Sequence, residues 1–330
     1  MRPGQAAKDR PDLATRVFEL KRKCLLDDIF KRKVFGKASG RVWTVEYQKR
    51  GLPHLHLLVF MENSGRFLRP EVIDDVIMAR FPTAAEDHDG SLAKIVEGTM
   101  IQGPCGDFDK GAICTENDAT GRPRCHRKFP KPFREETTVP DDSYPLYYRP
   151  NTGTVCEKTL RGRTVAITNE WVVPYSPFLL KRYNAHINVE ICNSVSAVKY
   201  IFKYVYKGGD RATVEFQAVN EVREYLDGRY LGPTEAVSRL LAFRFHDEFP
   251  FVQHLAVHLE GQHAVYYSDE VSRDPVHLQQ RKETARSTLM GYFQFNRNAP
   301  ANQLRCLYAE MPRLYTWNLS SREWRPRKNR

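Results

Sequence analysis

Hydrophobic residues recur at helical spacing in the first part of the chain. Basic residues separate these apolar positions, which between residues 13 and 35 are Leu13, Val17, Phe18, Leu20, Cys24, Leu25 and Ile29. The pattern predicts an amphipathic helix. The next two runs, RVWTVEYQ and PHLHLLVFM, are rich in β-branched and aromatic residues and flank the turn KRGL. They predict an antiparallel hairpin.

Helical and extended patterns alternate through the rest of the chain. Residues 62–80 indicate a helix, whereas 82–164 are irregular, rich in Gly, Pro, Asp and Thr, and hold four of the seven cysteines. HINVEICN from His186 predicts a strand, and SVSAVKYIFKYVYKGGD predicts a helix that ends at the glycine pair. FQAVNEVREYLDG and PTEAVSRLLAFRF predict helices, and FVQHLAVHLEGQHAVYY predicts a hairpin.

The expected class is therefore α+β. The patterns divide the chain into an N-terminal helix and hairpin (1–81), an irregular cysteine-containing insertion (82–164), a continuation of the first unit with the tyrosine-bearing helix (165–245), and a β-rich and helical extension (246–330).

Charge and composition narrow the function classes. Lys and Arg number 51 against 40 Asp and Glu, for a formal charge of +11 over 330 residues, which favours a polyanionic partner such as nucleic acid. No apolar run approaches the roughly 20 residues that span a bilayer, so no membrane partner is expected. An odd number of cysteines in a chain of this length favours reduced thiols or a metal site over a disulfide framework.

Two histidines on the predicted hairpin suggest metal chemistry. His54 and His56 are two apart on one strand, so both side chains project from the same face. If residues 49–51 form a three-residue loop, Glu46 lies opposite His54 on that face. This set suits Mg²⁺ or Mn²⁺ when substrate phosphate and water complete the coordination shell. The open alternative is that the histidines are polar positions on a half-exposed strand.

The predicted tyrosine helix offers a nucleophile. Tyr200 and Tyr204 are four apart and share a helix face, and Lys199, Lys203 and Lys207 form a neighbouring basic stripe that could contact DNA. Nearby cations favour the phenolate, which can attack a phosphodiester. The open alternative is that the aromatic stripe packs in a core.

Cysteines of the insertion offer a second metal site. Cys105, Cys114 and Cys125, with the adjacent His126, could hold zinc. The spacing contains no C-x-x-C knuckle, however, and neighbouring side chains at 125 and 126 cannot easily bind one ion. The spacing therefore favours a metal-free insertion over a zinc site.

The motifs together resemble a known family. EYQKRGLPHLHLLVF (46–60) and HINVEICNSVSAVKYIFKYVYKGGDR (186–211) resemble the paired signature of the Helitron Rep domain, one of the HUH endonucleases. The likeness extends over DRPDLATRVFELK, GPCG, KFPKPF, YLDGRYLGPTEA, FPFVQHLAVHL and LYAEMPRLYTW. It implies a central antiparallel sheet with the histidine strand in its middle, flanked by helices, and the tyrosine helix across one face.

The resemblance also implies roles for the motif residues. His54 and His56 would bind the divalent metal, and Tyr200 and Tyr204 would be the nucleophiles. Glu46 as third ligand depends on the register as much as on the family. The implied partner is single-stranded DNA at transposon ends, and the implied location is the nucleus.

The sequence differs from the family pattern at several places. The chain begins after the family's first strand, and Gln102 and Ser238 replace a usual histidine and a common tryptophan. The family's helicase domain is expected to be absent, because no Walker A motif occurs. The main hypothesis is a metal-dependent endonuclease and strand transferase that forms a 5′-phosphotyrosine. The rival is a catalytically inactive DNA-binding remnant of a truncated or domesticated transposase.

Overall fold

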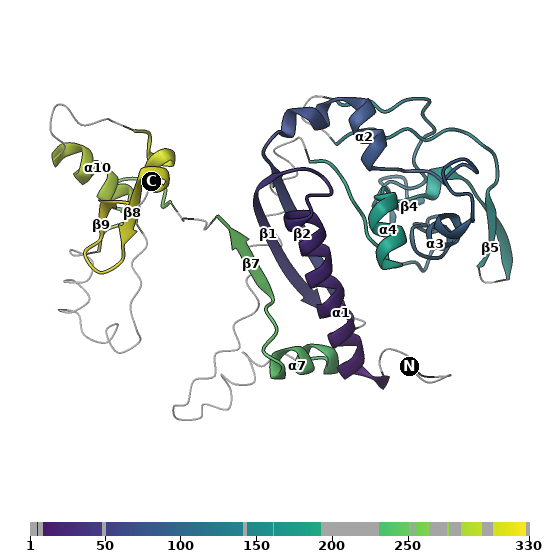
Figure 1. Ribbon diagram of the computed structural model, residues 1–330, viewed down its shortest axis with the longest axis horizontal. Helices are drawn as coiled ribbons and strands as arrows, with labels where there is room; N and C mark the ends of the chain where they lie inside the picture. The colour runs from purple at the N-terminus through teal and green to yellow at the C-terminus, as the bar shows by residue number, and fades with distance from the viewer. Residues whose placement is uncertain are drawn as a thin grey trace. The chain divides into compact units, whose positions relative to one another are not determined.

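The computed structural model describes residues 5, 9–47, 51–140, 144–160, 162–192, 231–250, 253, 255–263, 276, 285–298 and 306–327. The chain divides into two compact units, Met1–Pro250 and Phe251–Arg330 (Figure 1). The class is mixed α+β, with several helices and small antiparallel sheets. This class agrees with the one predicted from the sequence.

Helix α1 (Pro11–Leu26) continues into the π-helical turn η2 (Asp27–Lys31), which confirms the predicted N-terminal helix. Pro11 in the first turn fits a helix start, where its missing N–H is not needed. The buried face differs from the prediction, because Val17 and Leu20 are exposed whereas Glu19 and Arg22 are buried. The two charges pair in a fork at 2.8 and 2.6 Å, which makes their burial tolerable.

A three-stranded antiparallel sheet lies beside α1. Its order is β2-β1-β7, from β1 (Ala38–Tyr47), β2 (Pro53–Met61) and β7 (His246–Phe249). The Arg22 guanidinium of α1 stacks 4.2 Å from the centre of the Trp43 ring, so α1 packs on the sheet face that carries Trp43. Alternate residues of β1 therefore point away from α1.

The histidine strand β2 lies at the edge of this sheet, and β1 lies in the middle. The expectation that the histidine strand is central is thus wrong for the described part of the chain. Alternation within one strand predicts its faces but not its neighbours, because strand order is set by contacts between distant segments.

Short elements make up the next part of the first unit. They are η3 (Ser64–Leu68), α2 (Pro70–Val76), α3 (Ser91–Thr99), β3 (Thr115–Asn117), β4 (Pro123–Cys125), β5 (Cys156–Leu160), β6 (Arg163–Ile167), η4 (Asn169–Trp171) and α4 (Pro177–Tyr183). Two of them, η3 and α2, fall within the helix predicted for 62–80. Helix α3 was not predicted; the Asp87 carboxylate accepts hydrogen bonds from the Leu92 and Ala93 amides in its first turn.

The core of this region is aromatic and aliphatic. Tyr175, Leu180, Val96 and Met100 are fully buried, and the ribbon β3–β4 and the loop before it contribute Cys105 and Cys125 to the same cluster. Residues 82–164 therefore contain the short elements α3, β3, β4 and β5, and they share one core with helix α4 that follows.

The buried carboxylate of Asp28 ties η2 to α4. It accepts hydrogen bonds from Tyr183 Oη at 2.6 Å, from Arg32 at 2.7 Å and from Arg182. Burial alone raises the pKa of the Asp28 carboxyl, but the Tyr183 hydrogen bond and the Arg182 and Arg32 charges bring it below its ordinary value. The carboxylate thus fixes the chain just before His186.

The segment after α4 is not a strand in the structure, so the strand predicted from His186 is wrong over the described residues 186–192. Helix α7 (Pro233–Leu240) confirms the first part of the helix predicted for PTEAVSRLLAFRF, but it ends before the last five residues of that segment. The following residues turn into β7, a strand that was not predicted.

The second unit contains α10 (Thr288–Asn298), η5 (Tyr308–Glu310), α11 (Met311–Leu314) and the hairpin of β8 (Tyr315–Asn318) and β9 (Glu323–Pro326). Trp317 and Trp324 pack edge to face at 5.4 Å, against α10 at Gly291. The hairpin predicted for 251–267 is not formed over the described residues 255–263.

Across the parts of the chain that are described, no helix has both the length and the apolar character needed to span a membrane.

Candidate functional site

The hairpin β1–β2 places the predicted metal ligands on one face. Glu46 pairs directly with His54, and Thr44 pairs with His56. Directly paired residues in an antiparallel ladder project to the same side, so all four side chains point away from the face that α1 covers. The predicted register of Glu46 against His54 is confirmed.

The carboxylate of Glu46 also reaches the second histidine. Its Oε2 lies 3.1 Å from His56 Nε2, and both side chains are part exposed, at 41% for Glu46 and 30% for His56. Glu46 and His56 therefore contact each other, and each side chain is still partly accessible to a ligand from solvent.

The surroundings of His54 favour its neutral form. Burial lowers the pKa of its imidazole, and the neighbouring His56 and His186 lower it further, against the opposing effect of Glu46. A neutral imidazole is the form that binds a metal ion. His186 lies outside the hairpin, in the segment after α4, and its Nδ1 is 2.7 Å from the Thr99 carbonyl oxygen.

His246 is a further histidine on this face of the sheet that the sequence analysis did not single out. It pairs with Thr44 from β7, across β1 from His56, so it projects from the same face at a backbone distance of about 10 Å from His56. Its Nε2 lies 3.6 Å from a Glu248 carboxylate oxygen. The alternation in FRFHDEF could have indicated this strand, but the helical pattern before it was extended through the segment.

The remaining predicted site residues are the tyrosines and lysines of 199–207 and the cysteines of the insertion. Tyr200, Tyr204, Lys199, Lys203 and Lys207 fall outside the described residues. Among described residues, the one set of three Cys, His, Asp or Glu side chains whose ligand atoms all lie within 4.8 Å of one another is Cys105, Cys114 and Cys125. The side chains of Glu46, His54 and His56 share a face but are not gathered to that degree.

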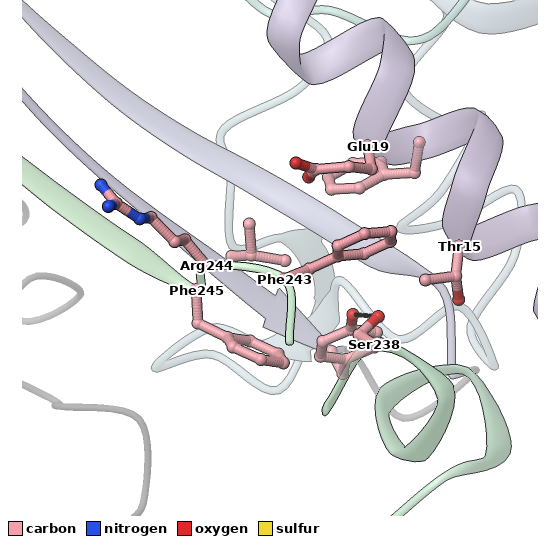
Figure 2. A pocket seen from close by; sticks show the side chains of 9 residues that line it. Thr15, Glu19, Ser238, Phe243, Arg244 and Phe245 are labelled. Carbon is pink, nitrogen blue, oxygen red and sulfur yellow. Dashed lines mark hydrogen bonds between the residues drawn. The ribbon is translucent and has the colours of Figure 1, made fainter. Parts of the chain in front are cut away.

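A small pocket lies on the opposite face of the hairpin. Its lining comes from α1, the end of β1, α7 and the segment between α7 and β7: Thr15, Phe18, Glu19, Val45, Tyr47, Ser238, Phe243, Arg244 and Phe245 (Figure 2). At its floor the hydroxyls of Tyr47 and Ser238 hydrogen bond to each other, and Ser238 Oγ donates to the Thr234 carbonyl oxygen at 3.0 Å. This contact fixes the β1 end that carries Glu46.

Comparison with known families concerns the same hairpin. Residues 1–59 match the family described as the Helitron helicase-like domain at the N-terminus. No curated protein matches the chain. The matched residues include α1, η2, β1 and most of β2, and therefore Glu46, His54 and His56. Residues 1–59 of this chain are thus similar to the N-terminal domain of that family.

Proposed function

We propose that this chain is a metal-dependent endonuclease and strand transferase that acts on single-stranded DNA of a rolling-circle transposon. The observation that carries the proposal is the pairing of Glu46 with His54, with His56 two residues on, inside a Helitron-related segment. Two imidazoles of β2 and a carboxylate of β1 on one face of the sheet form a donor set for a divalent cation.

The donor set fits Mg²⁺ or Mn²⁺. The Glu46 carboxylate supplies a hard oxygen ligand beside His56, and the partial exposure of both side chains leaves room for phosphate. When bound, the ion would polarise the scissile phosphate and stabilise the charge that develops on it. Glu46, His54 and His56 would hold and orient it.

The nucleophile in this proposal is Tyr200 or Tyr204, whose assignment comes from the sequence. The phenolate oxygen attacks phosphorus, the bond from phosphorus to the 3′ oxygen breaks, and the leaving oxygen takes a proton to become a 3′ hydroxyl. A 5′-phosphotyrosine remains, so resealing by the reverse step needs no ATP. Lys203 or Lys207 would stabilise phosphate charge.

The partner in this proposal is unpaired DNA at transposon ends. The net charge of +11 supports binding to a polyanion. A transposase of a eukaryotic element acts on chromosomal DNA, so the proposed location is the nucleus.

The test is covalent capture. The purified chain is incubated with labelled single-stranded oligonucleotides and Mn²⁺, and denaturing gels are read for a protein–DNA adduct. Three test samples are compared with the wild type: the wild type with EDTA, the double variant His54→Ala/His56→Ala, and the double variant Tyr200→Phe/Tyr204→Phe. His88→Ala, at an exposed position away from the hairpin, and Tyr206→Phe are the matched controls.

The expected result is an adduct in the wild type and both controls, reduced at least about a hundredfold in the three test samples. A folded protein that binds single strands in a salt-dependent way but forms no adduct would overturn the nuclease proposal. It would favour the inactive DNA-binding remnant instead.

A further inference from the structure

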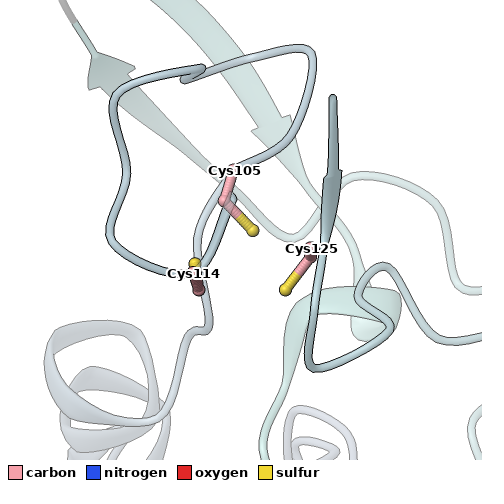
Figure 3. A group of neighbouring side chains, drawn as sticks. All are labelled: Cys105, Cys114 and Cys125. Atoms are coloured by element: carbon pink, nitrogen blue, oxygen red, sulfur yellow. The ribbon is translucent and has the colours of Figure 1, made fainter. Parts of the chain in front are cut away.

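Three cysteines that are separated in the sequence lie close together in space beside the ribbon β3–β4. The Sγ atoms of Cys105, Cys114 and Cys125 all lie within 4.8 Å of one another (Figure 3). Cys105 and Cys125 are buried, with 3% and 6% of their surface exposed. Three thiols converging in a core with this geometry form a donor set for a soft or borderline metal ion.

The ribbon brings Cys114 and Cys125 together. Thr115 pairs with Cys125 across β3–β4, and the His126 amide donates to the Cys114 carbonyl oxygen at 2.9 Å. The Cys114 and Cys125 thiols therefore lie at the open end of the hairpin, opposite its turn. His126 is exposed, and its Nδ1 lies 3.1 Å from the same Cys114 carbonyl oxygen, so its ring is engaged with the backbone.

A tight turn supplies Cys105. The Gly106 amide donates to Thr115 Oγ1 at 2.9 Å, which ties the turn to β3. Gly103 has a φ of +94°, and an added Cβ would lie 2.9 Å from the Trp171 ring, so glycine is required there. The third thiol is thus positioned by backbone contacts rather than by chance proximity.

The turn after Cys125 is held by a backbone hydrogen bond. The Lys128 amide donates to the Cys125 carbonyl oxygen at 2.8 Å, and Lys128 has a positive φ of 59°. These contacts fix the backbone on the C-terminal side of Cys125.

We propose that Cys105, Cys114 and Cys125 bind one Zn²⁺ that staples the turn at 103–106 to the ribbon β3–β4. Zinc–sulfur bonds of about 2.3 Å in a tetrahedron require sulfur–sulfur separations of about 3.8 Å, so shifts of about 1 Å or less close the site. An irregular region with two three-residue strands gains folding stability from such a clip.

The fourth position is the adjustable one. Gln102 Nε2 lies 3.3 Å from Cys114 Sγ, so a side chain at 102 reaches the cluster. An imidazole is of similar reach and is a stronger zinc ligand than an amide. Gln102→His is therefore expected to tighten zinc binding at least about tenfold, with a nitrogen added to the three sulfurs.

The experiment measures zinc per chain by mass spectrometry of the metal in protein purified without chelator. The wild type and Cys24→Ser, a control at an exposed position in α1, are expected to hold about one zinc each. Cys125→Ser should hold less than about a tenth of that. His54→Ala with His56→Ala should keep its zinc, which separates this site from the proposed nuclease site.

A second measurement avoids variants that fail to fold. In the native wild type, a thiol reagent is expected to find Cys105, Cys114 and Cys125 protected, and EDTA should expose all three without changing the others. Cobalt substitution should give the charge-transfer absorption of thiolate ligands and the visible bands of a tetrahedral ion.

Folded wild type that binds no zinc and shows the same thiol reactivity with and without EDTA overturns the proposal. A disulfide between any two of the three cysteines in protein purified with reductant also overturns it. If the wild type as purified forms the DNA adduct but holds no zinc, the zinc proposal fails and the nuclease proposal stands. If it holds zinc but forms no adduct, the zinc proposal stands and the nuclease proposal fails.

Discussion

Asp28 is the carboxylate whose removal tests the packing of the first unit most sharply. It is fully buried, and it accepts hydrogen bonds from Tyr183, Arg32 and Arg182. Asp28→Asn keeps the size of the side chain, removes its charge, and replaces one acceptor oxygen by a donor that faces other donors. The link between η2 and α4 should loosen.

The size of the effect follows from the partners. Removing one member of a fully buried ion pair costs about 3–5 kcal/mol, because the other charge is left without water. Here the Arg182 and Arg32 side chains are 39% and 61% exposed, so they can hydrate again. The loss is then set by charge-assisted hydrogen bonds, and we expect about 2–3 kcal/mol at pH 7.

The pH dependence has a defined sign. Folding lowers the pKa of the Asp28 carboxyl, so its contribution to stability is full above the unfolded value of about 4 and is lost as the pH falls through the lower folded value. The difference in unfolding free energy between wild type and Asp28→Asn should therefore shrink below about pH 4.

The assay is urea unfolding followed by tryptophan fluorescence from pH 7 to pH 3. Asp27→Asn is the matched control, because the neighbouring Asp27 is half exposed and pairs with Lys31, a contact expected to contribute less than about 1 kcal/mol. A loss for Asp28→Asn no larger than for the control, or one that does not change with pH, would refute the reasoning.

Three further outcomes are expected. Gly291→Ala should destabilise the second unit by about 1–3 kcal/mol, because the added Cβ would lie 2.3 Å from the Trp317 ring. Gly98→Ala in α3 should instead stabilise the first unit by about 0.5–1 kcal/mol, because nothing lies within 4 Å of the added Cβ. Thermal unfolding measures both effects. Glu46→Gln should lower Mn²⁺-dependent adduct formation at least about tenfold by removing the charge beside His56, with an unchanged urea midpoint. Affinity for single strands, measured by fluorescence anisotropy, should fall about a hundredfold between about 50 and about 200 mM salt if about five phosphates are neutralised.

Local patterns predicted local structure well. The period of two in the hairpin and the short turn between its strands leave few registers, so the sequence alone was enough to place Glu46 opposite His54. Apolar spacing located α1, but not its buried face, because the Glu19–Arg22 pair offsets the cost of burying charge and the stacking on Trp43 is a long-range contact.

Features that depend on distant segments escaped prediction. The position of β2 at the sheet edge and the presence of His246 opposite Thr44 depend on β7, which follows far along the chain. Cys105, Cys114 and Cys125 are candidate zinc ligands in the sequence, but their lack of knuckle spacing disfavours the site there; they meet because a ribbon and a glycine turn fold back on one another.

The most direct test of the nuclease account is to locate the DNA on the chain. Trypsin cuts after Lys199, Lys203 and Lys207, which places Tyr200 in YIFK and Tyr204 in YVYK. After nuclease trimming of an adduct formed with Mn²⁺, mass spectrometry should find a nucleotide phosphate on Tyr200 or Tyr204. An adduct on any other residue, or none from folded protein that binds single-stranded DNA, would contradict the account.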